Sequence, residues 1–418
     1  MNFRKTFPVS VFCITIALFV ASAGRPTGYC NPNENRQLPK LATFDDGSAY
    51  RTHDNIYWVL SLNGSWRNMG RQYGRLVRED LRQFYQDITE DVAARGIDKK
   101  AQLEVAKQFA DGLSYNLHEL LKGISETSGL DEDEVLLLNA GMLNLSGAVL
   151  GAEPHSACSG IAAWKSYTLD GAMVFGRNWD IDRKSMQKYM KYLSVVVFNP
   201  ELGNGFANVH PLGNIYLETG INDKGIFLEL NNGVYSDANM FEERENTVST
   251  LVSVLNQCNS LDEAAKYLSG VPGDLSYIIQ IADSKDCVSV ERPTFGARVR
   301  HSEQNGVLAA YNSFIPPYPK DWESKATQPR SSKEDPRYQN LLNLANSKEF
   351  YGKLNPEGMK KLMDIQMENG GATHKGSVLQ VIAAPKNLTL WIRGLDYSDW
   401  QEVNLTGLFK KKPESGMK

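Results

Sequence analysis

The residues with the clearest capacity for chemistry lie in one segment, HSACSGIAAWKSYTLDGAMVFGRNWDID at 155–182. Cys158 stands at the head of a predicted hairpin whose strands are joined by a tight Asp-Gly turn. Arg177 and Asp180 lie at the far end of its second strand. Because a hairpin folds its two ends together, Cys158 is expected to face Arg177 and Asp180 across neighbouring strands. A thiol beside a cation and a carboxylate is the arrangement in which an activated thiolate forms.

A purely structural role for these residues is the alternative. A single cysteine in a strand often serves as a small buried hydrophobic residue. Arg177 and Asp180 would then form an ion pair that only holds the hairpin together. The residues of this segment, taken alone, leave both interpretations open.

The elements that must position the hairpin are a helical front and a strand-rich body. Apolar residues at every third or fourth position predict one helix over 65–95 and a second over 101–121. Asp131, with Glu134 three residues later, predicts the start of a short third helix. After Gly151, short apolar runs predict strands at 159–168, 172–179, 193–199, 206–218, 225–232, 276–282, 287–291, 307–311, 377–383 and 389–393.

Three further helices are predicted within this strand-rich part. They span 247–268, 337–346 and about 356–368, and the segment 315–336, rich in Pro, Lys and Ser, is predicted to be an exposed loop. Helices outside two antiparallel sheets make an α+β layered sandwich.

The composition excludes two classes of protein. The 418 residues include 45 Lys and Arg against 49 Asp and Glu, a formal net charge of -4. Nucleic-acid binding would call for a strong basic excess, which is missing. A mean hydropathy of -0.38 and the lack of an 18-residue apolar run beyond the N-terminus exclude a polytopic membrane protein.

The first 23 residues are predicted to be a secretory signal peptide. Arg4 and Lys5 precede an apolar run at 7–20 and a small-x-small cleavage pattern at 21–23. Their removal would leave 395 residues and lower the net charge from -4 to -6, because two cations are lost. Four glycosylation sequons agree with an extracellular or lysosomal location, at Asn63, Asn144, Asn387 and Asn404.

The remaining cysteines are too few for a disulfide scaffold. Cys13 is lost with the signal, and no pair among the others has metal-ligand spacing. A bridge between Cys258 and Cys287 is compatible with an oxidising compartment and would leave Cys30 and Cys158, but the sequence does not fix the pairing. A disulfide at Cys158 would disable the candidate site.

Several other chemistries have no signature in the chain. There is no GxSxG elbow, no Walker P-loop and no GxGxxG fingerprint. The six histidines show no HExxH or other metal spacing, and no local signature supports a Ser-His-Asp triad. No metal and no organic cofactor is therefore expected.

The segment that starts at Cys158 resembles the mature N-terminus of the choloylglycine hydrolases, which include bile-salt hydrolases and penicillin V acylases. The shared motifs are Cys-Ser-Gly at 158–160, Asp-Gly at 170–171 and FGRNWD at 175–180. Two blocks before it, GSWRNMGRQYGRLVRED (64–80) and LLKGISETSGLDEDEVLLLN (120–139), resemble the pro-segment of autoproteolytic acyltransferases like isopenicillin-N acyltransferase. Later blocks agree in order, at 220–233, 276–291, 311–314 and 335–338.

The resemblance, over roughly 60–400, implies an N-terminal-nucleophile hydrolase with a four-layer αββα sandwich. It divides the chain into the signal peptide (1–23), a helical N-terminal segment or α chain (24–157) and a catalytic domain or β chain (158–418). Such proteins are made as inactive precursors that cut the bond before the nucleophile themselves, here Ala157–Cys158. Family members often have Gly before the Cys, so Ala157 is a departure from the pattern.

Cleavage would make Cys158 a complete catalytic unit. It frees an α-amine with a pKa of about 8 next to a thiol with a pKa of about 8.5, so proton exchange between them is nearly balanced. One residue then supplies both nucleophile and base. By the resemblance, Asp180 orients the α-amine, and Arg177 holds the thiolate and polar groups of the substrate.

The resemblance also assigns supporting roles to later residues. Asn312 and an Asn at a strand end, either Asn232 or its neighbour Asn231, would donate hydrogen bonds to the tetrahedral oxyanion. Arg337 matches an Arg that opens a helix and supports the site in choloylglycine hydrolases. Ser313 stands where the acyltransferases often have His.

The implied function is that of a secreted or lysosomal self-processing cysteine amidase. It would hydrolyse a linear C–N amide bond of an N-acylated amine or amino acid through an acyl-thioester at Cys158. Lipid amides are one substrate class, and Trp164, Trp179, Phe227 and Phe314 would either line an apolar acyl pocket or belong to the hydrophobic core. The alternatives are acyl transfer to an amine and a non-catalytic secreted binding protein. The expected partners are the small N-acyl amide and the two associated chains, without nucleic acid or stable membrane insertion.

Overall fold

Two β-sheets form the centre of the fold. The computed structural model describes residues 38–146, 158–181, 183–233, 244–325 and 333–410. The first sheet has ten strands in the order β1 (Lys40–Phe44), β2 (Gly47–Arg51), β3 (Trp58–Gly64), β6 (Leu193–Pro200), β7 (Phe206–Pro211), β8 (Thr219–Asn222), β9 (Phe227–Asn232), β10 (Tyr277–Ala282), β11 (Cys287–Arg292) and β12 (Arg298–His301). The second has six, in the order β13 (Val307–Ala310), β4 (Ser159–Ala163), β5 (Val174–Asp180), β14 (Ser377–Ala384), β15 (Thr389–Gly394) and β16 (Gln401–Asn404).

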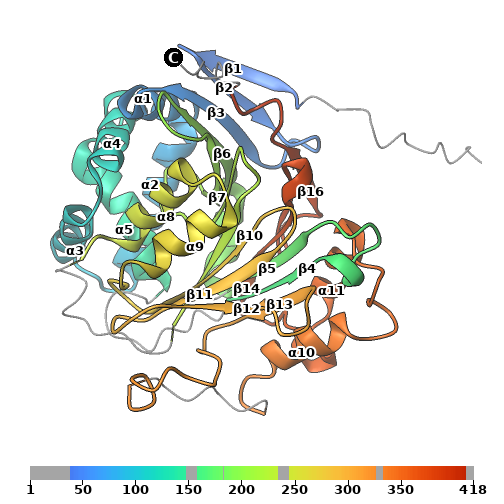
Figure 1. The fold of residues 1–418 in the computed structure, drawn as a ribbon. Coiled ribbons are helices and arrows are strands. Elements are labelled where there is room, and N and C mark those ends of the chain that lie inside the picture. Colours follow the sequence, from blue (N-terminus) through green and yellow to red (C-terminus); the bar gives the residue numbers. More distant parts are fainter. Residues whose placement is uncertain (1–37, 147–157, 182, 234–243, 326–332, 411–418) are drawn as a thin grey trace, which may run out of the picture. The chain divides into compact units, whose positions relative to one another are not determined.

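Helices cover the outer face of each sheet (Figure 1). The ten-stranded sheet contacts α1 (Trp66–Leu76), α8 (Thr247–Gln257) and α9 (Leu261–Ser269), and the six-stranded sheet contacts α10 (Arg337–Ala345) and α11 (Pro356–Asp364). The inner faces meet where the rings of Phe175 and Phe227 lie 4.8 Å apart. Helix, sheet, sheet and helix make four layers, so the predicted αββα fold class is confirmed.

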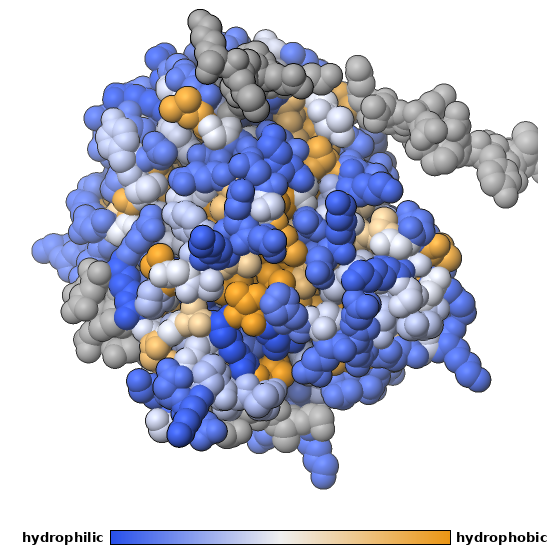
Figure 2. Space-filling view, in the orientation of Figure 1, coloured by the Kyte–Doolittle hydropathy of each residue, from blue (hydrophilic) through white to orange (hydrophobic). Residues whose placement is uncertain are grey.

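The remaining described helices belong mainly to the N-terminal part of the chain. They are α2 (Arg78–Ala94), α3 (Lys99–Asp111), α4 (Tyr115–Ser128), α5 (Glu132–Ser146) and the short α6 (Arg183–Met186). Their apolar stripes point into the main core, and Figure 2 shows a mostly hydrophilic face with hydrophobic residues gathered toward its middle. None of the described helices is long and apolar enough to cross a bilayer.

The N-terminal segment is more than the helical front that the sequence predicts. Strands β1, β2 and β3 precede its helices, and β3 pairs in parallel with β6 along its whole length. An Asp-Gly pair at 46–47, a common hairpin signal, lies at the β1–β2 turn. Residues 38–418 form one compact unit, so the boundary between 157 and 158 remains a prediction about cleavage.

Both long helices predicted for this front are broken in two. The first is interrupted at Val77, which has non-helical φ and ψ of -126° and 33°, and the second at 112–114. The halves pack against different partners, since α1 lies on α4 whereas α2 and α3 lie on α5. Apolar periodicity continues across such a break because both halves bury a stripe, so the pattern does not reveal the change of direction.

Two glycines explain the close packing of α1 on α4. A Cβ on Gly70 would lie 2.1 Å from the carbonyl oxygen of Leu120, and one on Gly123 would lie 2.2 Å from that of Arg67. Any larger side chain would push the helices apart. The glycine spacing of the 64–80 block therefore serves a helix contact in this fold.

Other predictions need smaller corrections. The strand predicted over 206–218 ends at Pro211, and its continuation is a loop before β8. Likewise the helix predicted over 247–268 is divided between α8 and α9. The strand predicted over 159–168 ends at Ala163, and residues 164–173, with a 3-10 helix at Lys165–Tyr167, connect it to β5 in place of the predicted tight Asp-Gly turn. Strands β8, β12 and β16 were not predicted. The capping box of Asp131 and Glu134 is confirmed, with reciprocal backbone hydrogen bonds of 2.8 and 3.0 Å.

The suggested disulfide is wrong. Cys158, Cys258 and Cys287 are all free thiols, each buried. Cys258 follows the end of α8, and Cys287 starts β11. Because Cys158 is also a free thiol, the alternative of a disulfide at Cys158 is wrong as well. The signal peptide, Cys30 and Ala157 lie outside the described residues.

Candidate active site

The β4–β5 hairpin brings the predicted nucleophile to its predicted neighbours. Ser159 pairs with Asn178 and Gly160 with Arg177, so Cys158 lies opposite the end of β5. Its Sγ is 4.0 Å from the backbone oxygen of Asp180 and 3.9 Å from Nη2 of Arg177. The hairpin argument from the sequence therefore places these three residues correctly.

Arg177 is a fixed bridge between the two sheets. Its side chain is fully buried. Its guanidinium donates to the backbone oxygen of Glu218, just before β8, and to the hydroxyl of Thr219, the first residue of β8. It also donates to the backbone oxygen of Leu230, at 2.9 Å. Nε lies 3.4 Å from Oε2 of Glu229. A cation held by so many partners stays beside the thiol without a rotamer change.

The thiol of Cys158 is neutral in the uncleaved chain. Burial raises its pKa to about 12, and the charge of Arg177, which lowers the pKa, does not compensate. The carboxylates of Asp180 and Glu218 raise the pKa further. Arg177 alone therefore does not make Cys158 a thiolate at neutral pH, and a nearby base is needed.

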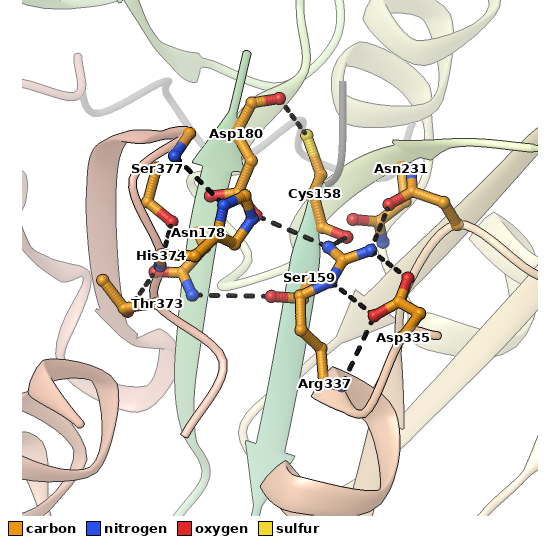
Figure 3. A network of polar contacts seen from close by, with 12 residues as sticks. Cys158, Ser159, Asn178, Asp180, Asn231, Asp335, Arg337, Thr373, His374 and Ser377 are labelled. Atoms are coloured by element: carbon orange, nitrogen blue, oxygen red, sulfur yellow. Dashed lines mark hydrogen bonds and ion pairs between the residues drawn. The ribbon is translucent and has the colours of Figure 1, made fainter. Parts of the chain in front are cut away.

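Asp180 has one oxygen bound and one oxygen unoccupied. Oδ2 lies 3.2 Å from Nε2 of His374 and 3.5 Å from Nη1 of Arg337 (Figure 3). Oδ1 is buried and has no hydrogen-bond partner among the described residues. A buried carboxylate oxygen without a donor is costly, by about 1–3 kcal/mol or more. The site therefore has an acceptor ready for a donor next to Cys158.

Arg337 connects the parts of this network. It forms two hydrogen bonds with Asp335, of 2.8 and 2.6 Å, and donates to the backbone oxygen of Cys158 at 2.9 Å (Figure 3). Nη2 is 3.2 Å from Oδ1 of Asn312. Burial by itself would lower the pKa of Arg337, but Asp335 more than offsets this and raises it. The helix-opening Arg thus touches the nucleophile's backbone, Asp180 and the predicted oxyanion donor.

The two candidates at the end of β9 differ in their surroundings. Asn231 is fully buried, and its Nδ2 donates to Glu229 at 2.7 Å. Asn232 is only half-buried, and its backbone oxygen accepts a hydrogen bond of 2.8 Å from Nδ2 of Asn312. Asn232 and Asn312 therefore lie together, and the Nδ2 groups of Asn231 and Asn312 each donate one hydrogen bond in the structure. Which of Asn231 and Asn232 donates to the oxyanion stays a prediction.

Sequence reasoning missed three polar residues of the site. Glu229 is fully buried, and burial raises its pKa to about 7, with Arg177 as the main opposing influence. The sequence feature that could have revealed Glu229 is its place as a single acidic residue between two leucines in a predicted buried strand. Asp335 stands two residues before Arg337, in the matching block at 335–338. His374 lies in a loop before β14 and has no local signal.

One of the four sequon residues is clearly exposed. Asn387 lies on the connection between β14 and β15, and its side chain faces solvent. Asn63 and Asn404 are half-buried, and Asn144 lies in α5. Glycosylation at these residues stays a prediction.

A family model covers the part of the chain that holds most of this network. The model for acyl-coenzyme A:6-aminopenicillanic acid acyl-transferase matches residues 168–394, more than half of the chain. The chain belongs to this acyl-transferase family. The match includes Arg177, Asp180, Asn232, Asn312 and Arg337 and begins ten residues after Cys158. The superfamily proposed from the sequence motifs is therefore confirmed.

Solved structures of amide hydrolases resemble this acyl-transferase family member. A Caenorhabditis elegans ortholog of N-acylethanolamine-hydrolyzing acid amidase is 18% identical, with a TM-score of 0.43, covering 59% of this chain and 100% of that one. A mutant conjugated bile acid hydrolase from Clostridium perfringens is 14% identical, with a TM-score of 0.44 and coverage of 61% and 95%. Penicillin V acylase from Agrobacterium tumefaciens is 12% identical, with a TM-score of 0.38 and coverage of 60% and 88%. No curated protein matches the chain.

Replacing Arg337 is expected to destabilise this family member strongly. Arg337→Met leaves the buried carboxylates of Asp335 and Asp180 without their cation, which typically costs about 3–5 kcal/mol. We expect a loss of that size in urea unfolding, measured in a Cys158→Ala background so that cleavage does not interfere. Arg82→Met, which removes an exposed surface ion pair with Glu79, is the matched control and should change little. Equal effects of the two changes would contradict the assigned network.

Glu229 should make the stability of the precursor depend on pH. Its folded pKa of about 7 exceeds the ordinary value of 4.5, so the folded state retains a proton that the unfolded chain releases. The free energy of unfolding should therefore be highest below about pH 4.5 and fall as the pH rises through 7. Glu229→Gln should lack this fall in urea unfolding between pH 4.5 and 8.

The control for this experiment is Glu104→Gln, which changes an exposed glutamate on α3. It should keep the wild-type pH slope. An unaltered slope in Glu229→Gln would show that another group carries the dependence.

Proposed function

We propose that this protein is a self-processing cysteine amidase of the secretory route, with Cys158 as its nucleophile. The observation that carries the proposal is the position of Asp180. Its carboxylate is held by Arg337 and His374, yet it keeps one buried oxygen without a donor beside Cys158. The α-amine that cleavage would create on Cys158 is a donor suited to that oxygen.

The first proposed reaction is cleavage of the bond between Ala157 and Cys158. Sγ attacks the Ala157 carbonyl carbon as its proton passes to the departing nitrogen, so the C–N bond breaks and a thioester forms. Water then hydrolyses the thioester, which gives a carboxylate on Ala157, a free thiol and a free α-amine. The hydrogen bond from Arg337 to the Cys158 backbone oxygen fixes the residue during this step.

The second reaction repeats this chemistry on a substrate amide. The α-amine of Cys158 accepts the thiol proton, and the thiolate attacks the substrate carbonyl. The amine product leaves with that proton, and water hydrolyses the acyl-thioester to the acid and the thiol. Asn232 and Asn312 are proposed to donate to the oxyanion in each tetrahedral intermediate. In other enzymes, one such donor stabilises the transition state by about 3–4 kcal/mol.

The fold offers a reason for the two chains to remain associated after cleavage. Strand β3 of the 24–157 segment is hydrogen-bonded to β6 from Trp58 to Gly64, inside the ten-stranded sheet. The core residues of α1 and α2 belong to the same apolar cluster as those of β6 and β7. A cut before Cys158 breaks none of these contacts.

The proposed substrate class is an N-acylated amine or amino acid. Acyl transfer to an amine is the second candidate, because the matched family is described as an acyl-transferase. The two reactions share the thioester and differ only in whether water or an amine attacks it. An extracellular or lysosomal location is part of the proposal and rests on the signal sequence and sequons.

One experiment tests the proposal and separates the two candidates. The purified secreted protein is analysed by N-terminal sequencing, then incubated with butyryl-7-amino-4-methylcoumarin with and without glycine. We expect a chain beginning at Cys158, an acid-quenched mass increase equal to one butyryl group on that chain, and release of the fluorophore. Butyrate as the product in the presence of glycine indicates hydrolysis, and butyrylglycine indicates acyl transfer. A chain that stays whole, without a butyryl adduct, overturns the proposal.

A further inference from the structure

A second group of polar side chains is buried beside the candidate active site. His210 is the second-last residue of β7, and Tyr216 and Glu218 follow in the loop that leads to β8. His210 and Tyr216 are 6% and 7% exposed, and the side chain of Glu218 is 25% exposed. Glu218 touches the catalytic network through its backbone oxygen, which accepts from Arg177, and through its charge, which raises the pKa of Cys158, but no role has been given to the side chains of His210 and Tyr216.

Each of these side chains has a polar atom without a hydrogen-bond partner among the described residues. The atoms are Nδ1 of His210, Oη of Tyr216 and Oε2 of Glu218. The distance from Glu218 Oε2 to His210 Nε2 is 3.8 Å, which is too long for a hydrogen bond. Buried polar groups in folded proteins nearly always have partners, and each unsatisfied one costs about 1–3 kcal/mol. The rings of His210 and Tyr216 are 6.4 Å apart and His210 lies beside Glu218, so one polar occupant can serve all three side chains.

The group lies next to the reacting thiol. Nη1 of Arg177 donates to the backbone oxygen of Glu218, and Nη2 of the same guanidinium lies 3.9 Å from Sγ of Cys158. Trp179, the neighbour of Asp180, packs its ring 5.5 Å from the ring of His210. A molecule whose carbonyl is attacked by Cys158 would therefore extend to these side chains within a short distance.

The charge of the group defines the chemistry of the occupant. Burial alone would raise the pKa of Glu218, but its interactions with His210, the charge of Arg177 and a hydrogen bond with the Trp179 side chain lower the pKa below the ordinary value. Glu218 is thus a carboxylate at neutral pH, and a carboxylate only accepts hydrogen bonds. An apolar acyl tail placed here would leave all three atoms unsatisfied. A cationic group that donates several hydrogen bonds would satisfy them.

We propose that His210, Tyr216 and Glu218 form a subsite for the polar end of the substrate, and that this end carries an ammonium group. The inference rests on the proposed amidase function, because it assumes that the scissile bond lies at Cys158. It replaces the apolar acyl pocket expected around Trp179 with a polar one on that side. The ammonium belongs either to the acyl part or to the amine part of the amide, and both sources are tested.

The test uses pairs of amides that differ only by an ammonium in place of a methyl group. For the acyl side, β-alanyl-7-amino-4-methylcoumarin is compared with butyryl-7-amino-4-methylcoumarin. For the amine side, N-hexanoylputrescine is compared with N-hexanoylpentylamine, and released hexanoate is measured by mass spectrometry. We expect at least a tenfold higher kcat/KM for the ammonium member of one pair, which identifies the source.

Variants assign the preference to the subsite. Glu218→Gln keeps the shape of the side chain and removes its charge, so the ratio between the two members of the preferred pair should fall toward one. Glu104→Gln on α3 removes an exposed charge and should keep the wild-type ratio. The same amides are also tested for equilibrium binding by calorimetry, which gives a readout besides turnover.

The outcomes separate the subsite from the proposed function. Turnover without a preference for ammonium in either pair, or a preference that Glu218→Gln retains, overturns the subsite and leaves the amidase function standing. Tighter binding of an ammonium member that depends on Glu218, without turnover of any amide, supports the subsite and overturns the amidase function. Neither binding nor turnover overturns both, and water is then the occupant of the polar group.

Discussion

The Cys158→Ala variant is expected to remain a single uncleaved chain and to lose all measurable amide turnover. In the proposed mechanism, the same sulfur cuts the chain and attacks the substrate, so one substitution removes both reactions. Removal of the nucleophile in well-studied hydrolases lowers kcat on the order of 10⁶-fold. Intact mass, N-terminal sequencing and release of aminomethylcoumarin measure the two losses separately.

The matched control is Cys258→Ala, because Cys258 is also a buried free thiol but lies at the end of α8. It should be cleaved before residue 158 and turn over substrate like the wild type. Both variants should give the wild-type circular dichroism spectrum. A Cys158→Ala protein that is still cut before residue 158 would mean that another protease makes the cut, and the self-processing step would have to be abandoned.

The Asp180→Asn variant is expected to lower kcat/KM by about 10²–10⁴-fold, the usual range for loss of a positioned acid–base group. The substitution keeps the shape of the side chain but removes the charge that would hold the α-amine of Cys158. The pH–rate profile should change as well, because the α-amine is then no longer held beside the thiol. Turnover is measured on protein whose N-terminus has been confirmed as Cys158, so that slower cleavage is not counted as slower catalysis.

Asp396→Asn is the control for this variant. Asp396 also pairs with an arginine, Arg183, but its side chain is 56% exposed, and the loss should be small. Wild-type kcat/KM and an unaltered pH profile in fully cleaved Asp180→Asn protein would contradict the assigned role of the carboxylate. His374→Gln, which keeps a polar partner near Asp180, should have a milder effect on both quantities.

Local patterns were enough to predict the layers of the fold. Short apolar runs and the capping box each depend on residues close in sequence, and the corresponding elements β4, β5 and α5 are present, although the β4–β5 connection is longer than the predicted tight turn. Helix breaks were missed because a buried stripe continues through Val77 even though α1 and α2 pack on different partners. Strand β3 was missed because its parallel partner, β6, lies about 130 residues later in the chain.

The site was predicted in part for a similar reason. Cys158, Arg177 and Asp180 belong to one hairpin, so their proximity follows from local geometry. Glu229 and His374 come from separate elements, and only the folded chain brings them to Arg177 and Asp180, respectively. Asp335 stands two residues before Arg337, so this pair is local, but its burial depends on the folded chain. Their roles depend on burial, which raises the pKa of Glu229 and which no spacing rule records.

By itself, the sequence determined the class of fold, the candidate nucleophile and the cation and carboxylate beside it, because each of these depends on a short run of residues. Tertiary structure decided the protonation of that nucleophile, since burial between two sheets outweighs the charge of Arg177. It also decided that Arg337 contacts both Cys158 and Asp180, and that His210, Tyr216 and Glu218 gather near them. The contacts of Arg337 join residues 179 and 157 positions apart, where only the packing of whole layers fixes the distance.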